Sequence, residues 1–77
     1  MPKYYVTSDC VLENFNITVS ANTPSEAALK AVKFAINKYH VVYEPSSVYV
    51  DERGYKYDGF SATNIYELSV ILKNLII

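Results

Sequence analysis

The chain is short of the residues that make covalent and metal cross-links. Its 77 residues include one cysteine, Cys10, and one histidine, His40. A disulfide within the chain is therefore excluded, and a structural zinc site has too few good ligands. A core of this size rarely supplies more than about 3–5 kcal/mol of net stability without such help. We therefore expect no metal and no cofactor, and we expect a partner subunit to add stability.

Catalytic and phosphate-binding patterns are also scarce. Gly54 and Gly59 are the only glycines, so a glycine-rich phosphate loop is excluded. Cys10 and His40 are the one candidate nucleophile–base pair, but no spacing brings them together. A semi-buried thiol and a histidine favoured by the negative end of a helix are the simpler interpretation. The sequence therefore predicts a protein that is not an enzyme.

Three acidic residues near one turn, Asp51, Glu52 and Asp58, are the remaining candidate cation ligands. Their spacing differs from that of a calcium loop, and Arg53 and Lys56 lie among them. We interpret this segment as a solvated, charge-balanced hairpin.

Long apolar runs and an excess of one charge are both missing. No apolar run approaches the roughly 18 residues of a membrane-spanning helix. The net charge of −1 argues against binding to nucleic acid or to an anionic membrane surface. No basic and then apolar leader opens the chain, since residues 1–5 lead straight into a strand pattern. With an unpaired cysteine, this predicts a cytoplasmic protein.

The residues that are present favour a folded domain. Hydrophobic residues make up 51% of the chain and charged residues 19%, a composition typical of globular proteins. The length suits one domain, residues 1–77.

Thr23 to Glu26 predict where the first helix begins. Thr23 can accept a hydrogen bond from a first-turn amide, Pro24 suits the first helical position, and Glu26 can reach back to the cap.

From Ala27 to His40, a spacing of about 100° per residue gathers the apolar residues on one broad face. That face comprises Ala28, Leu29, Ala31, Val32, Ala35, Ile36 and Tyr39. Phe34 lies outside it, so we expect something other than the sheet to cover this ring. We expect fraying around His40.

Alternation and turn residues predict four strands, at residues 4–8, 15–20, 47–51 and 55–58. Phe15, Ile17 and Val19 point to one side of the second strand, and Val48 and Val50 point to one side of the third.

A last helix is predicted from Ile65 to about Leu75, with Asn64 as its cap. The alternative is a strand from Ile65 to Leu72, because apolar residues also alternate there. As a helix the segment has two apolar stripes. One comprises Ile65, Leu68, Ile71, Leu72, Leu75 and Ile76, and the other comprises Tyr66, Val70 and Ile77.

The predicted fold is therefore α+β in the order β-β-α-β-β-α: two layers, with an antiparallel sheet of about four strands and both helices on one face. A helix with two apolar stripes needs two surfaces to pack on. We expect a self-associating interaction protein, most simply a two-fold homodimer, with Phe34, Tyr66, Val70 and Ile77 at its interface. A different protein partner is the other reading of that interface.

Tyrosine is the one unusual abundance, with eight in the chain. Tyr5 and Tyr49 are predicted on the outer face of the sheet, opposite Val6, Val48 and Val50. Such rings can stack on unpaired bases, anchor a protein interface, or be ordinary strand residues. Nucleic-acid binding through this face is the alternative function, which the net charge disfavours.

The overall string resembles small proteins of tailed bacteriophages, particularly the marine cyanophage type. The matching stretches are residues 4–8 (YYVTS), 19–28 (VSANTPSEAA), 50–55 (VDERGY) and 72–75 (LKNL). The resemblance implies an accessory role in the cytoplasm of an infected bacterium, and it implies no catalytic residues.

Overall fold

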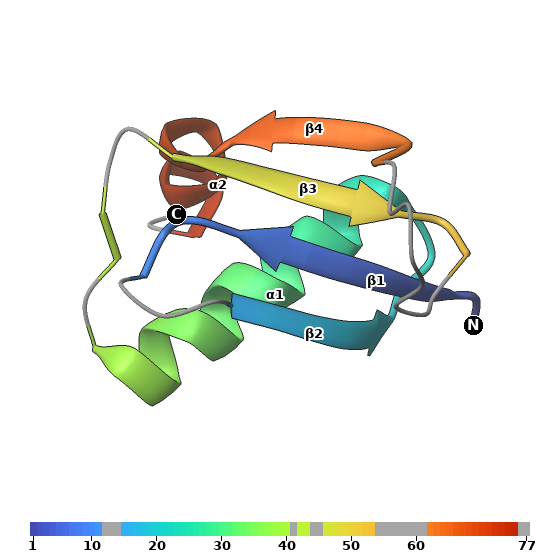
Figure 1. Cartoon of the computed structure of the whole chain (residues 1–77), viewed down its shortest axis with the longest axis horizontal. Coiled ribbons are helices and arrows are strands. Elements are labelled where there is room, and N and C mark those ends of the chain that lie inside the picture. Colours follow the sequence, from blue (N-terminus) through green and yellow to red (C-terminus); the bar gives the residue numbers. More distant parts are fainter. Residues whose placement is uncertain (12–14, 41, 44–45, 54–61, 76–77) are drawn as a thin grey trace.

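One antiparallel sheet with two helices behind it organises the chain (Figure 1). The computed structural model describes residues 1–11, 15–40, 42–43, 46–53 and 62–75. The strands are β1 (Lys3–Ser8), β2 (Phe15–Ser20), β3 (Ser47–Asp51) and β4 (Asn64–Glu67), and the helices are α1 (Pro24–Tyr39) and α2 (Leu68–Leu75). The strand order is β2-β1-β3-β4. The predicted α+β class and the predicted element order are confirmed.

The core lies between the sheet and α1, as the alternation of the strands predicts. Val6, Val48 and Val50 have no exposed surface. The matching face of α1 is closed by residues that are buried or packed against the core: Ala27, Ala28, Leu29, Ala31, Val32, Ala35, Ile36 and Tyr39. The predicted helix stripe is therefore confirmed.

Side chains and backbone groups define both ends of α1. The Thr23 hydroxyl accepts a hydrogen bond from the Glu26 backbone N–H at 3.1 Å. The Glu26 carboxylate accepts from the N–H of Asn22 at 3.3 Å, one residue before the predicted partner. At the other end His40 takes a left-handed conformation (φ 66°) and donates its N–H to the Ile36 carbonyl at 2.8 Å. The helix therefore ends in a defined cap at His40, where we had expected fraying.

The C-terminal segment corrects two predictions. Residues 64–67 form strand β4 and the helix begins only at Leu68, so the predicted helix start at Ile65 and the predicted cap at Asn64 are wrong. The alternative strand to Leu72 is wrong beyond Glu67. The reason is pairing with β3, which puts Asn64 opposite Val50 and Tyr66 opposite Val48. The strand predicted at residues 55–58 lies outside the described residues.

The change from strand to helix also changes which side chains are covered. Ile65, predicted on the buried helix face, is 63% exposed on β4. Within α2 the expected apolar face is present: Leu68 and Ile71 are buried, and Leu72 and Leu75 pack against the core. Neither α1 nor α2 is long and apolar enough to cross a lipid bilayer.

Candidate interaction surfaces

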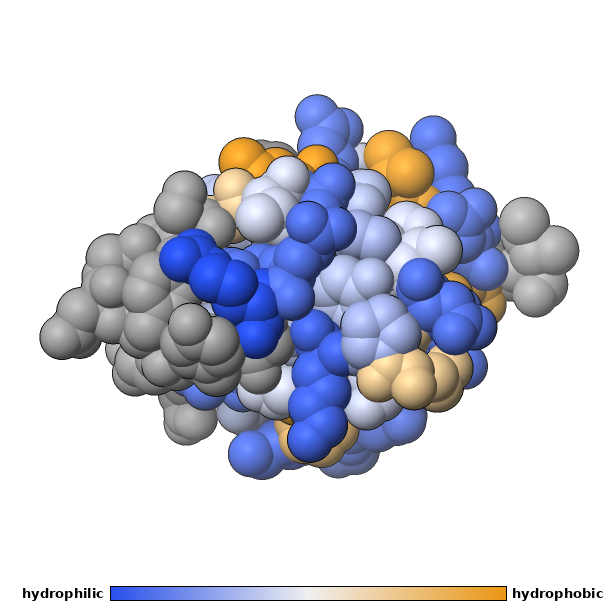
Figure 2. Space-filling view, turned by 90° about the vertical axis from the view of Figure 1, so that its right-hand side faces the viewer, coloured by the Kyte–Doolittle hydropathy of each residue, from blue (hydrophilic) through white to orange (hydrophobic). Residues whose placement is uncertain are grey.

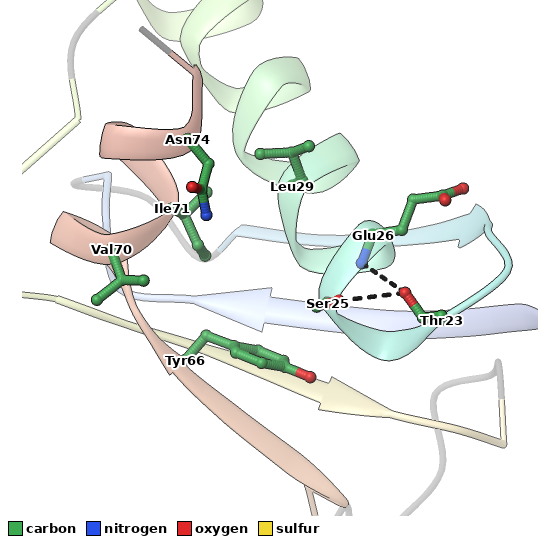
Figure 3. Close-up of a pocket in the computed structure, with 8 residues that line it drawn as sticks. All are labelled: Thr23, Ser25, Glu26, Leu29, Tyr66, Val70, Ile71 and Asn74. Carbon is green, nitrogen blue, oxygen red and sulfur yellow. Dashed lines mark hydrogen bonds between the residues drawn. The ribbon is translucent and has the colours of Figure 1, made fainter. Parts of the chain in front are cut away.

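A groove of about 520 Å³ lies between the first turn of α1, helix α2 and strand β4 (Figure 3). Its lining combines four polar and four largely apolar side chains: Thr23, Ser25, Glu26 and Asn74, and Leu29, Tyr66, Val70 and Ile71. Such a mixed lining can hold an apolar side chain and orient it with a few polar groups.

The polar end of the groove is bonded within itself. The hydroxyls of Thr23 and Ser25 lie 3.1 Å apart, and the Thr23 hydroxyl also accepts from the Glu26 N–H. The Glu26 carboxylate lies 3.4 Å from the Lys30 ammonium. These local bonds complete the cap of α1. The carboxylate also disfavours an anion at this helix terminus.

Tyr66 connects the groove to the sheet. Figure 3 shows its ring extending from β4 toward the first turn of α1. Burial raises the pKa of its phenol above the ordinary value of 10.0. The negative charge of Glu52 raises this pKa further, and Tyr4 adds a smaller increase. Tyr66 is therefore neutral at physiological pH and can donate a hydrogen bond. Next to it, Val70 of α2 is 51% exposed.

The second surface is the β2 edge, defined here by residues 15–20 together with Phe34 of α1. The Phe34 ring is 42% exposed, and its centroid lies 6.2 Å from that of Phe15 on β2. The Lys38 ammonium lies 5.9 Å from the Phe34 centroid. The structure therefore covers one side of Phe34 with a sheet residue, whereas we had expected cover from elsewhere.

Figure 2 shows the end of the molecule at which β1 begins and β2 and β3 end. The hydropathy of this end differs from that of the two surfaces above. Hydrophilic side chains cover most of what is described there, and apolar side chains occur as separate small spots. The larger exposed apolar side chains of the helices lie elsewhere: Phe34 beside β2 and Val70 on α2.

The residues predicted for one interface are divided between two surfaces. Tyr66 and Val70 lie together in the groove. Phe34 lies beside β2, at the opposite edge of the sheet from β4. Ile77 lies outside the described residues. The helical stripe that joined Tyr66 to Val70 in the sequence analysis does not exist, because Tyr66 belongs to a strand.

The outer face of the sheet is less open than its tyrosines indicated. The register pairs Tyr5 with Asp51 and Tyr49 with Thr7, on the face opposite Val6 and Val50. Tyr5 is only 5% exposed, and Tyr49 is partly exposed.

Asp51 is a buried charge that the sequence analysis missed. Its carboxylate has no exposed surface and accepts two hydrogen bonds from the Arg53 guanidinium, at 3.0 and 2.7 Å. The Arg53 backbone N–H donates a third, at 2.8 Å. The interpretation of Asp51 as a solvated hairpin residue is therefore wrong. The sequence signal was an arginine two residues later in a turn, which allows this local fork-shaped pairing.

Cys10 and His40 do not share an environment. Cys10 is completely buried and its carbonyl accepts a hydrogen bond from the Tyr43 N–H at 2.7 Å. His40 is exposed at the end of α1. In the part of the chain that the structure describes, no three residues among His, Cys, Asp and Glu come together as metal ligands.

Comparison of the chain with protein-family models, with curated proteins and with solved structures finds no significant match. The functional argument therefore rests on the geometry of these surfaces.

Proposed function

We propose that this protein is a small non-catalytic interaction protein that associates with itself. The observation that supports this most directly is Phe34, an aromatic side chain that a well-formed helix holds 42% exposed beside an edge strand. Aromatic side chains are enriched at protein interfaces. Fully covering a large apolar side chain contributes about 1.5–3 kcal/mol before the cost of association.

The setting that goes with this proposal is the cytoplasm, and the resemblance to tailed-phage proteins adds an accessory role in an infected bacterium. Self-association would also add stability to a small chain, because a domain of about this length has little core to stabilise it alone. The alternative hypothesis is that a different protein covers the same surface.

Nucleic-acid binding through the outer sheet face ranks lower. Stacking needs accessible rings, and Tyr5 is 5% exposed. The net charge of −1 offers little attraction to phosphates.

Sedimentation equilibrium over a wide range of protein concentration tests the proposal. We expect an average mass that rises from the 8.7 kDa of one chain toward twice that value. Phe34→Ala should weaken the association, while Tyr43→Ala should not. Tyr43 is the matched control because it is 45% exposed but lies after α1. A wild-type protein that remains at 8.7 kDa at every concentration would contradict the proposal.

A further inference from the structure

We infer that two copies of the chain associate by pairing their β2 strands antiparallel, with Thr18 on the two-fold axis. This inference rests on the proposed self-association and specifies its surface. The result is one continuous sheet of two copies, a mode of association in which backbone hydrogen bonds supply much of the affinity.

The first step is to determine which backbone groups of β2 point away from the sheet. The Ala21 N–H donates to the Pro2 carbonyl at 3.1 Å, so the pair Pro2–Ala21 bonds across β1 and β2. Bonded and non-bonded pairs alternate along an antiparallel ladder. The register then makes Tyr4–Val19 and Val6–Ile17 the next bonded pairs. The N–H and C=O groups of Asn16, Thr18 and Ser20 therefore point outward.

Two further bonds agree with this assignment. The Lys30 ammonium donates to the Ser20 carbonyl at 2.7 Å, from α1 and not from β1. On the other side of the sheet, the Leu68 N–H donates to the Ser46 carbonyl at 3.0 Å, which directs the even-numbered residues of β3 toward β4. The odd-numbered residues of β1 then bond to β3 and its even-numbered residues bond to β2. The alternation is consistent across all four strands.

The second step is that β2 lacks the features that usually protect an edge. Natural edge strands carry charges or proline, or are very short. β2 has the sequence FNITVS, with neither a charge nor a proline in its six residues. Lys30 reaches one carbonyl at its end. The opposite edge, β4, is shorter, carries Glu67 and continues directly into α2. The β2 edge is therefore the better template for a second chain.

The third step is register. A two-fold axis through Thr18 places Asn16 opposite the partner's Ser20, so that every outward-pointing residue of β2 meets another. The polar side chains of Asn16, Thr18 and Ser20 share the outer face, where all three are exposed. On the helix face, Ile17 meets the partner's Val19. Both side chains are half-buried in one copy, so this register joins polar to polar and apolar to apolar.

Phe34 extends the same interface behind the sheet. In Figure 1 the last turns of α1 reach past β2 at the lower left, and Phe34 lies against Phe15 there. The second sheet half would continue across this position. In this register the partner's Ala21 lies opposite Phe15, and the partner's Val19 is the next residue on the helix face, so both lie near the exposed side of Phe34.

Cross-linking tests the axis directly. Residues opposite each other in a bonded antiparallel pair have Cα atoms about 5.5 Å apart, within the range that a disulfide spans. Thr18→Cys should therefore form a covalent dimer under mild oxidation. Ile65→Cys is the matched control, because Ile65 is an outward-pointing residue of the opposite edge strand and is 63% exposed. The native Cys10 is buried. Equal cross-linking of both variants would overturn the inference.

Introducing a charge on the two-fold axis gives the second measurement. Thr18→Lys places like charges opposite each other on the axis, an arrangement that is destabilising in sheets. We expect its dimer dissociation constant to rise by about tenfold or more, with Ile65→Lys close to the wild type and circular dichroism unchanged in both. A wild-type dimer that Thr18→Lys leaves intact would overturn this interface but not the proposed self-association. A wild-type monomer would overturn both.

Discussion

The Asp51 carboxylate shows how one residue depends on a charge partner that lies close to it in the sequence. Asp51 has no exposed surface, and Arg53 is its charge partner, with 43% of the arginine side chain still exposed. A buried carboxylate needs both hydrogen bonds and an opposite charge, because burial alone disfavours its ionised form. Here the turn after β3 supplies both from a position two residues away.

Replacement of Arg53 should therefore be destabilising. Arg53→Gln removes the charge and the fork-shaped pairing, and we expect the free energy of unfolding to fall by about 2 kcal/mol. This is less than the about 3–5 kcal/mol of fully buried pairs, because Arg53 is partly solvated. Urea denaturation measures the change. Lys33→Gln, which removes the same charge from an exposed helix position, should change the stability by less than about 0.5 kcal/mol. Equal effects would contradict the role of the pair.

Tyr66 should make stability depend on pH in alkaline solution. Its pKa is raised in the folded state above the ordinary 10.0, so the folded protein holds this proton more tightly than the unfolded chain does. The stabilisation is complete below the unfolded pKa and is lost as the pH rises through the folded pKa. Tyr66→Phe should therefore reduce the loss of stability above about pH 10.

Thermal unfolding of the wild type, Tyr66→Phe and the control Tyr43→Phe between neutral and alkaline pH measures this effect. The control retains Tyr66 and should follow the wild type. If Tyr66→Phe loses as much stability in alkaline solution as the wild type does, other groups account for that loss.

At the scale of elements, α1 has a stabilising cap at its N-terminus and a strained backbone conformation at its C-terminus. The Thr23 hydroxyl caps its first turn, and replacing such a cap by alanine typically costs about 1 kcal/mol. At the other end His40 has φ 66°, in the left-handed region that favours glycine. The strained end therefore offers a route to a more stable protein.

His40→Gly should stabilise the protein by about 0.5 kcal/mol, since glycine removes the steric cost of the positive φ but adds freedom to the unfolded chain. Asn37→Gly is the matched control. It lies one turn earlier in the exposed face of α1, where glycine should be destabilising by about 1 kcal/mol. Denaturation midpoints of the two variants should therefore move in opposite directions, and a lower midpoint for His40→Gly would contradict this account of the cap.

At the scale of the whole molecule, association and folding should be coupled. The chain is small, and in the proposed dimer the β2 edge gains its hydrogen bonds and apolar contacts from the second copy. Binding to the folded state alone raises the apparent stability by mass action. The melting temperature of the wild type should therefore rise with protein concentration.

Scanning calorimetry over about a hundredfold range of concentration measures this rise. Thr18→Lys should melt at one temperature throughout that range, and Ile65→Lys should behave as the wild type does. A wild-type melting temperature that does not change with protein concentration would argue that the stability of this fold needs no second copy.

Much of the fold follows from local patterns. β2 and β3 have the predicted bounds, and α1 begins after the predicted cap with the predicted face toward the core. In these segments the alternation, the capping residues and the helical spacing all favour the same structure. Each signal lies within a few residues of the backbone that it specifies, so the sequence alone was sufficient there.

Tertiary structure decided what depended on distant partners. The segment from Ile65 to Leu72 has apolar residues at both strand and helix spacing, and pairing with β3 decided for a strand at residues 64–67. The pairing of Asp51 with Tyr5 follows from the register of β1 and β3, and the separation of Phe34 from Tyr66 and Val70 follows from the strand order. Strand order is set by hydrogen bonds between segments far apart in the chain, and no local spacing in the sequence records which edge remains open.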